Sequence, residues 1–301
     1  MAVLTAQGIS DVAVELLTRT LVLPNTVTRI PGSDFSGDNG DTITVRVPQP
    51  GTARIQASRG SDITFDDTYE VPVDVSMTHL YHGKLLTDEE MTFDIKRFAS
   101  QITRVQVAAV ATGAEDQLAG VMNALTADDD AVNPDGTNVR DAILGARAFL
   151  GGNNAPASGR WLAVSPDFAT ALLSDEVMVK VNEAGSESAL RNAVIGRIFG
   201  FTVVESNGLT AGSAVAYHES GFAWANRTAG APRGAKDSAM TSSGGVSLRQ
   251  IFDYIPTKLS DTSILSTFAG AAAVYDWDFD ESGEPESGDV AKRFYKLELG
   301  S

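Results

Sequence analysis

The hydrophobic period of the chain changes between residues 82 and 94, and this change limits the folds that are open to it. Residues 41–47 and 69–77 alternate apolar and polar side chains, which is typical of strands with one buried face. Over residues 94–125 the apolar side chains instead recur at three- and four-residue steps, which predicts one helix. About 30 helical residues extend roughly 45 Å, so we expect this helix to act as a beam along which other elements pack.

The two alternating segments predict a protruding β-hairpin, because a polar, glycine-containing stretch separates them. Pro72 cannot donate a backbone hydrogen bond, so the second strand should lie at a sheet edge or carry a bulge. A two-stranded hairpin is marginally stable alone in water. We therefore expect the hairpin to lie on a neighbour, which is the first indication of assembly.

The N-terminal 40 residues have the pattern of an arm. Residues 7–20 carry apolar side chains at helical spacing, Pro24 should end this helix, and residues 31–40 are rich in glycine and polar residues. The segment is too short to build a core of its own.

The start of the long helix carries capping signals. Thr87 and Glu90 have the spacing of a capping box for a turn before the long helix, and Thr92 or Asp94 can cap the helix itself.

The second half of the chain has a mixed α/β pattern. Helices are expected at residues 139–150 and after Ser165, which would cap a helix that begins with Pro166. The turn at Asn207 and Gly208 should use positive φ angles. Residues 228–246 should form a loop. The expected strands are residues 161–164, 201–204, 214–217, 222–225, 246–255 and 264–275.

Three segments resemble the Hong Kong 97-like major capsid proteins of tailed bacteriophages. They are ATGAEDQLAGVMNAL at the end of the long helix, WLAVSPDFATALL at residues 161–173, and GRIFGFTVVESNGL within residues 187–209. The resemblance implies an α+β Hong Kong 97-like capsid fold. Its parts would be an N-terminal arm (1–40), an extended β-hairpin loop (41–86), a peripheral domain with the spine helix (87–136), a mixed α/β axial domain (137–245), and closing strands with a C-terminal tail (246–301).

The same resemblance implies a structural role. The chain would self-assemble as pentamers and hexamers into the icosahedral head of a tailed phage that encloses double-stranded DNA. Its partners would be a separate scaffolding protein, a portal and, as an optional addition, a decoration protein. It would be found in the virion capsid after assembly in the host cytoplasm. An encapsulin-like compartment shell and, behind it, an acidic α/β enzyme are the alternatives.

Two departures from the family pattern carry expectations. Some members begin with a scaffolding segment of about a hundred residues, whereas only 40 residues precede the hairpin here, so we expect the scaffold to be a separate protein. Other members cross-link through a lysine in the extended loop, but residues 41–83 contain no lysine. Arginine stays protonated and is not an isopeptide nucleophile at neutral pH, so we expect an uncross-linked shell.

Composition and motifs favour neither catalysis nor metal binding. The net charge of −16 disfavours a protein that grips phosphate backbones, and no cysteine is present. His79 and His82 should point to opposite faces of a strand, and His218 has no partner nearby in sequence. Residues 128–136 resemble a calcium loop but lack its final acidic ligand, so we expect a solvated acidic loop. We therefore expect a protein that is not an enzyme, with no catalytic, cofactor-binding or metal site, no cofactor and no membrane partner.

The C-terminal segment alternates aromatic and acidic residues over 275–280. We expect a docked strand with Tyr275, Trp277 and Phe279 facing inward and the carboxylates outward. Residues 281–289 should be disordered by composition. The apolar residues of 294–299 should dock either on the same subunit or at a subunit boundary.

Overall fold

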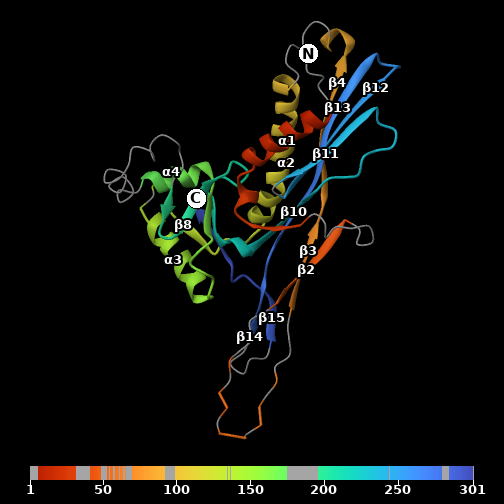
Figure 1. The fold of residues 1–301 in the computed structure, drawn as a ribbon. Coiled ribbons are helices and arrows are strands. Elements are labelled where there is room, and N and C mark those ends of the chain that lie inside the picture. Colours follow the sequence, from red (N-terminus) through yellow and green to blue (C-terminus); the bar gives the residue numbers. More distant parts are fainter. Residues whose placement is uncertain are drawn as a thin grey trace.

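Two sheets of six strands each form the body of the protein in its computed structural model (Figure 1). We call them the β13 sheet and the β9 sheet after their central strands. The structure describes residues 6–31, 41–48, 53, 55–56, 58–60, 62–63, 65, 70–91, 99–133, 135, 137–174, 196–243, 245–279 and 285–300. The predicted loop at 32–40, the proposed helix caps Thr92 and Asp94, and residues 187–195 of the family-like segment lie outside these ranges.

The β13 sheet is built around one long strand that has neighbours on both of its edges. One edge of β13 pairs with β12 and β10, and the other pairs with β4 along ten residues. All these pairs are antiparallel, whereas β1 joins β10 in parallel. The strands of this sheet are β1 (Thr28–Ile30), β10 (Phe222–Arg227), β13 (Ser260–Ala273), β12 (Val246–Ile255), β11 (Asp237–Ser243) and β4 (Thr78–Thr87).

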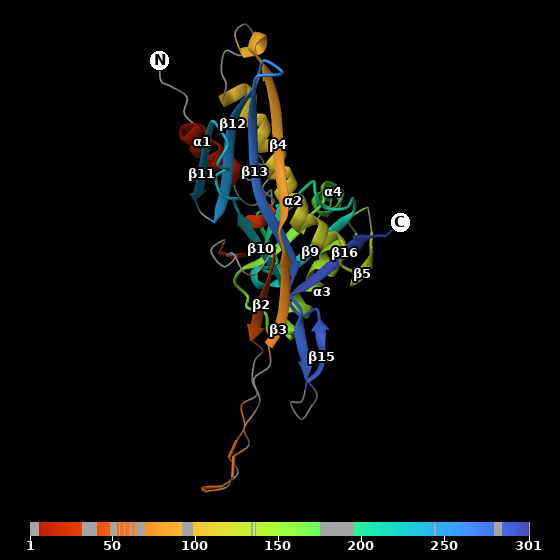
Figure 2. The ribbon, with the colours of Figure 1, turned by 90° about the vertical axis from the view of Figure 1, so that its right-hand side faces the viewer.

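Helices α1 (Ala6–Thr20) and α2 (Arg104–Asn123) cover one face of the β13 sheet (Figures 1 and 2). Leu17 of α1 and Leu118 of α2 are fully buried there with Leu265 of β13. The predicted N-terminal helix is confirmed. The long helix is confirmed over α2 and the π-helical turn η4 (Ala99–Thr103) that precedes it, and its expected start at residue 94 lies outside the described residues.

The β9 sheet lies between two hydrophobic cores, so its central strands are apolar on both faces. Ala214 and Ala216 of β9 face α3 and α4, whereas Val215 and Tyr217 join the core beneath α2. This burial on both faces is typical of a central strand. The elements are β5 (Asp129–Val132), β16 (Phe294–Leu299), β9 (Ser213–His218), β6 (Arg160–Val164), β8 (Phe201–Glu205) and β7 (Arg197–Ile198), with helices α3 (Val139–Gly152) and α4 (Pro166–Ser174).

The expected elements of this half are largely confirmed. The backbone N–H of Phe168 donates to Ser165 Oγ at 3.3 Å, so Ser165 caps α4 as predicted. The turn at Asn207 and Gly208 is different, because neither residue has a positive φ angle. The capping box before the long helix is present, since Thr87 and Glu90 exchange side-chain to backbone hydrogen bonds of 3.1 and 3.2 Å.

The predicted hairpin is confirmed as β2 (Thr42–Pro48) and β3 (Glu70–Ser76), which pair antiparallel. Among the described residues these two strands form a sheet by themselves, so Pro72 lies on an edge strand as expected. Val73 and Val75 are buried against Ala223 and Ala225 of β10. The base of the hairpin is therefore covered by its own chain.

The sequence does not predict the short strands β1 and β7, nor four further strands that lie where composition argues against a strand. β4 continues the hairpin beyond Met77, with alternation broken by polar residues and Gly83. β11 lies in the segment predicted as a loop, and its small polar residues pair with β12 in a complete antiparallel ladder. β5 lies in the predicted acidic loop. β15 (Pro285–Val290) lies in the tail predicted to be disordered, and it pairs with β14 (Asp276–Phe279).

The expected orientation of the C-terminal strand β14 is wrong for Asp276, although Tyr275 and Trp277 do pack against the cores. Asp276 is buried at 5% exposure, whereas Tyr275 and Trp277 are only half-buried. The reason is a partner distant in sequence, Arg293, which binds the Asp276 carboxylate and offsets the cost of burying it. The apolar residues of 294–299 dock as predicted, and they do so within the same subunit. Strand β16 pairs with β9 and buries Phe294 and Leu297.

Candidate assembly surfaces and the joint between the sheets

The hairpin extends into a loop that carries large apolar side chains in solvent. Ile55 is 95% exposed, Phe65 is 85% exposed and Ile63 is 59% exposed. The loop projects from the body at the end opposite to α1 (Figures 1 and 2). Three large apolar side chains on one projecting segment are a surface that water disfavours. Sequence reasoning placed the loop but missed these residues, although isolated Ile and Phe in a polar stretch were a usable signal.

The face of the β13 sheet opposite to α1 and α2 is a second apolar surface. Leu86 of β4 is buried toward α2, so the alternating residues Tyr81 and Leu85 point to the other face, where they are 71% and 42% exposed. Ile264 of β13 lies on the same face, because it pairs with Gly83 between these two residues, and Ile251 of β12 pairs with Ile264 in turn; both are partly buried. The residues directly opposite Tyr81 and Leu85 are Ser266 and Thr262. The protein thus has a projecting loop and a sheet face that both carry exposed apolar side chains, and neither has a covering layer among the described residues.

The family-like segment at residues 196–209 is where the β9 sheet meets α2. Ser206 Oγ donates to Glu115 Oε1 at 2.7 Å, and the Asn123 amide donates to the Gly208 carbonyl at 3.0 Å. The Asn123 side-chain oxygen accepts from the Thr210 N–H at 2.8 Å. A Cβ atom on Gly208 would lie 2.9 Å from the Ala119 Cβ atom. Glycine is therefore required here by the close approach of α2 and not by a positive φ angle.

We expect Gly208→Ala to destabilise the protein by about 1–3 kcal/mol, because the added methyl group must push the turn away from α2. Gly120→Ala is the matched control, since a Cβ atom there would meet nothing within 4 Å. Within a helix that change should stabilise by about 0.5–1 kcal/mol. Chemical denaturation of both variants measures the difference, and equal stability of the two would contradict the packing argument.

Lys296 of β16 connects the β9 sheet to the C-terminal end of α2. Its side chain is buried, and its Nζ donates to the backbone carbonyls of Asn123 and Leu125 at 3.0 and 2.9 Å. Glu298 supplies the opposite charge at 2.7 Å. The last carbonyls of a helix have no hydrogen-bond partner within the helix, and they form the negative end of its dipole. A buried cation both donates hydrogen bonds to these carbonyls and balances their negative charge. Asp128 anchors the same strand by accepting from the Lys296 N–H, and burial raises the pKa of this carboxyl.

We expect Lys296→Met to cost about 1–3 kcal/mol, because it leaves two buried carbonyls without a donor. Lys258→Met, at an exposed lysine, should change stability by less than about 0.5 kcal/mol. Thermal unfolding of the two variants side by side tests this, and a loss at Lys296 no larger than at Lys258 would show that the cap contributes nothing.

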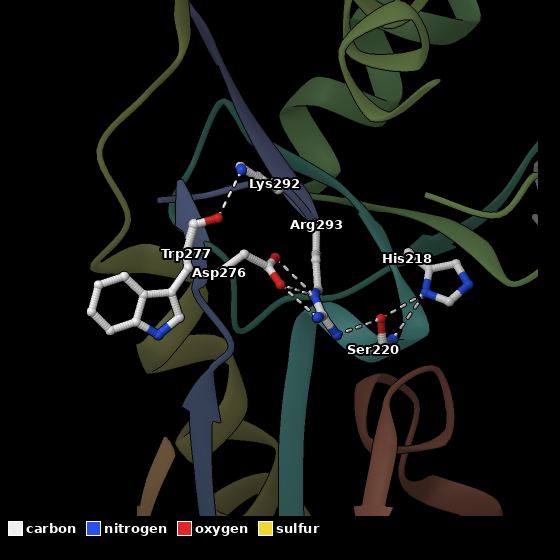
Figure 3. Close-up of polar contacts among 6 residues, drawn as sticks. All are labelled: His218, Ser220, Asp276, Trp277, Lys292 and Arg293. Atoms are coloured by element: carbon white, nitrogen blue, oxygen red, sulfur yellow. Dashed lines mark hydrogen bonds and ion pairs between the residues drawn. The ribbon is translucent and has the colours of Figure 1, made fainter. Parts of the chain in front are cut away.

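A polar cluster lies where the chain passes between the two sheets (Figure 3). Arg293 Nε contacts both carboxylate oxygens of Asp276 at 3.0 and 2.8 Å, and its Nη1 donates to Ser220 Oγ at 3.3 Å. Ser220 contacts the Nδ1 atom of His218 through both its hydroxyl and its backbone N–H. Next to this cluster, Lys292 binds Asp278 at 2.9 Å and the Trp277 carbonyl at 2.8 Å.

The histidines and carboxylates considered from sequence do not converge. His79 stacks on Phe268 at 4.5 Å between ring centroids, His82 lies further along β4, and His218 belongs to the cluster above. In the part of the chain that the structure describes, no group of three His, Cys, Asp or Glu residues could hold a metal ion. No helix of the described ranges is long and apolar enough to cross a membrane.

Two sheets, the helix α2 that packs on both of them, and a projecting loop together make up the fold of this chain. Over residues 85–277, more than half of its length, the chain matches the family model described as phage capsid protein, and it belongs to this family. It is a structural protein of the virion capsid and not an enzyme. No curated protein matches it in sequence.

Solved capsid structures have the same fold as this chain. A chain of Mycobacterium phage Che8 is 18% identical, with a TM-score of 0.63 over 92% of this chain and 90% of that one. The capsid of cyanophage P-SCSP1u is 11% identical, with a TM-score of 0.61 over 93% and 89%. A virus-like particle from Pyrococcus furiosus is 10% identical, with a TM-score of 0.51 over 97% and 98%. These likenesses confirm the expected Hong Kong 97-like capsid fold.

Proposed function

We propose that this chain is the major capsid protein that forms the icosahedral head of a tailed phage and encloses its double-stranded DNA. The observation that carries the proposal is the projecting loop with Ile55, Ile63 and Phe65 in solvent, on a chain of the phage capsid protein family. The loop has no apolar cover within the described residues, and a copy of the same chain offers one on its β13 sheet. A contact between two different surfaces of identical subunits repeats from subunit to subunit, and it forms closed rings when the rotation between neighbours divides a full turn.

In this proposal residues 41–86 are the extended loop that lies on an adjacent subunit, and residues 87–136 carry the spine helix. Residues 137–245 form the axial domain at the centres of pentamers and hexamers, residues 1–40 form the arm, and residues 246–301 contribute the closing strands and tail. A separate scaffolding protein, a portal and an optional decoration protein are the further partners, and assembly takes place in the host cytoplasm. The net charge of −16 suits an inner wall that holds DNA without gripping its phosphates.

The enclosed material distinguishes this function from an encapsulin-like shell, which the likeness to the Pyrococcus furiosus particle keeps as the second candidate. The test is to purify particles from cells that make the chain in its natural setting, treat them with nuclease, and analyse their contents. Nuclease-protected double-stranded DNA of one length supports the phage head. Particles that instead hold a stoichiometric enzyme and no protected DNA would support the compartment shell.

A further inference from the structure

Three segments of the chain that connect the two sheets pass through one place. β9 ends at His218, and after the short turn η5 (Glu219–Gly221) the chain enters β10 of the β13 sheet. β13 leads to Asp276 at the start of β14, and Arg293 directly precedes β16 of the β9 sheet. Backbone hydrogen bonds join these segments directly. The His218 N–H donates to the Arg293 carbonyl at 3.0 Å, and the Val274 N–H donates to the Gly221 carbonyl at 2.9 Å.

The hydrogen bonds that His218 makes at this joint suit its neutral form. Its Nδ1 atom accepts from the Ser220 N–H at 3.2 Å and lies 2.9 Å from Ser220 Oγ. An atom that accepts from a backbone N–H carries no proton of its own, so the ring proton belongs on the opposite nitrogen. The ring also hydrogen-bonds to the backbone of Ser158, which precedes β6. Figure 3 shows the chain of contacts from His218 through Ser220 to Arg293 and Asp276.

We propose that His218 is an acid-sensitive lock between the β9 sheet and the β13 sheet, and that its protonation loosens the joint. A proton on Nδ1 turns this atom from an acceptor into a donor, which removes the acceptor of the Ser220 N–H. The same proton places a positive charge beside Arg293, the other partner of Ser220 Oγ. The lock concerns how the two sheets are coupled, so it goes beyond the role of the chain as a shell subunit.

The groups that face His218 from neighbouring elements shift its pKa, some upward and some downward. Burial is the largest influence and lowers its pKa, and the cations Arg293 and Arg160 lower the pKa further. Glu219 in η5 and the Ser158 backbone raise the pKa but do not outweigh burial. Asp276 faces Arg293 and forms the ion pair with it. The folded chain therefore binds this proton less readily than the unfolded chain does.

The sign of the pH dependence follows from this difference. Above the ordinary histidine pKa of about 6.5 the neutral ring contributes its full stabilisation. As the pH falls from that value toward the lower pKa of the folded state, the unfolded or opened state gains protons that the closed joint lacks, so stability is lost. Within this window the equilibrium constant for closing should fall by up to about tenfold per pH unit.

The test is hydrogen exchange with mass spectrometry on the full-length chain at pH 7.5 and 5.5, with intrinsic exchange corrected for pH. We expect peptides that cover residues 213–227, 270–279 and 290–299 to lose protection at the lower pH in the wild type. His218→Gln keeps an acceptor at this place but does not titrate, so its exchange at the joint should not depend on pH. The control His79→Gln changes an exposed histidine of β4 and should behave like the wild type.

A joint in His218→Gln that remains as sensitive to pH as in the wild type would overturn the proposal. Should this variant not fold, the wild type decides the matter, because it has three histidines whose ring carbons can be titrated by NMR. His218 must then titrate below about 6.5, with the amide signals of the joint shifting along the same curve. A His218 that titrates at or above that value would refute the lock.

Discussion

Replacing Ile55 and Phe65 together with serine is expected to abolish shell assembly at concentrations where the wild type assembles, while the subunit stays folded. Both side chains are exposed in the single chain, so their removal leaves no cavity in its core. Burying each in a neighbour contributes about 1.5–3 kcal/mol. The loss of both should therefore raise the concentration needed for assembly by roughly 10²- to 10⁴-fold.

Light scattering during assembly, with circular dichroism of the free subunit, measures this effect. Ala53→Ser is the matched control, because it changes an exposed residue of the same loop without removing a large apolar side chain. We expect the control to assemble like the wild type. Normal assembly of the double variant would show that the loop does not use these side chains to join subunits.

The second large effect is expected from Asp276→Asn, which breaks the ion pair with Arg293 at the joint between the sheets. The Asp276 side chain is 8% exposed and that of Arg293 is 22% exposed, so the change leaves a largely buried cation without its partner. Such a loss costs about 3–5 kcal/mol. A subunit with ordinary stability of about 5–15 kcal/mol would lose a large part of it.

Asp278→Asn provides a matched control two residues further along β14. Its side chain is 49% exposed and pairs with Lys292, and a pair in contact with solvent contributes less than about 1 kcal/mol. Urea unfolding of both variants should show a much lower midpoint for Asp276→Asn only. Similar midpoints for the two would mean that the buried pair does not hold the joint.

The elements that could be predicted from sequence are those whose own residues determine them. The period of α2, the alternation of β2 and β3, and the cap formed by Ser165 are local signals, and the structure confirms them. β11 and β15 carry no such signal, because small and polar residues form a strand there only through pairing with β12 and β14.

The joint between the sheets was beyond sequence reasoning for a related reason. Asp276 lies in an alternating strand, and alternation alone places its carboxylate in solvent. The partner that reverses this is Arg293, 17 residues away and beyond a hairpin. Likewise, the Asn-Gly sequence at Gly208 is typical of a turn with a positive φ angle, but glycine is required there because Ala119 of α2 lies so close. Contacts distant in sequence decide both cases.

The most direct test of the central claim, that this chain joins copies of itself through its projecting loop, is a cryo-EM reconstruction of the assembled particles. We expect a closed shell with five-fold and six-fold capsomers, in which Ile55 and Phe65 of each subunit lie buried on the β13 sheet of a neighbour. A reconstruction in which the loop folds back on its own subunit, or leaves these side chains in solvent, would contradict it.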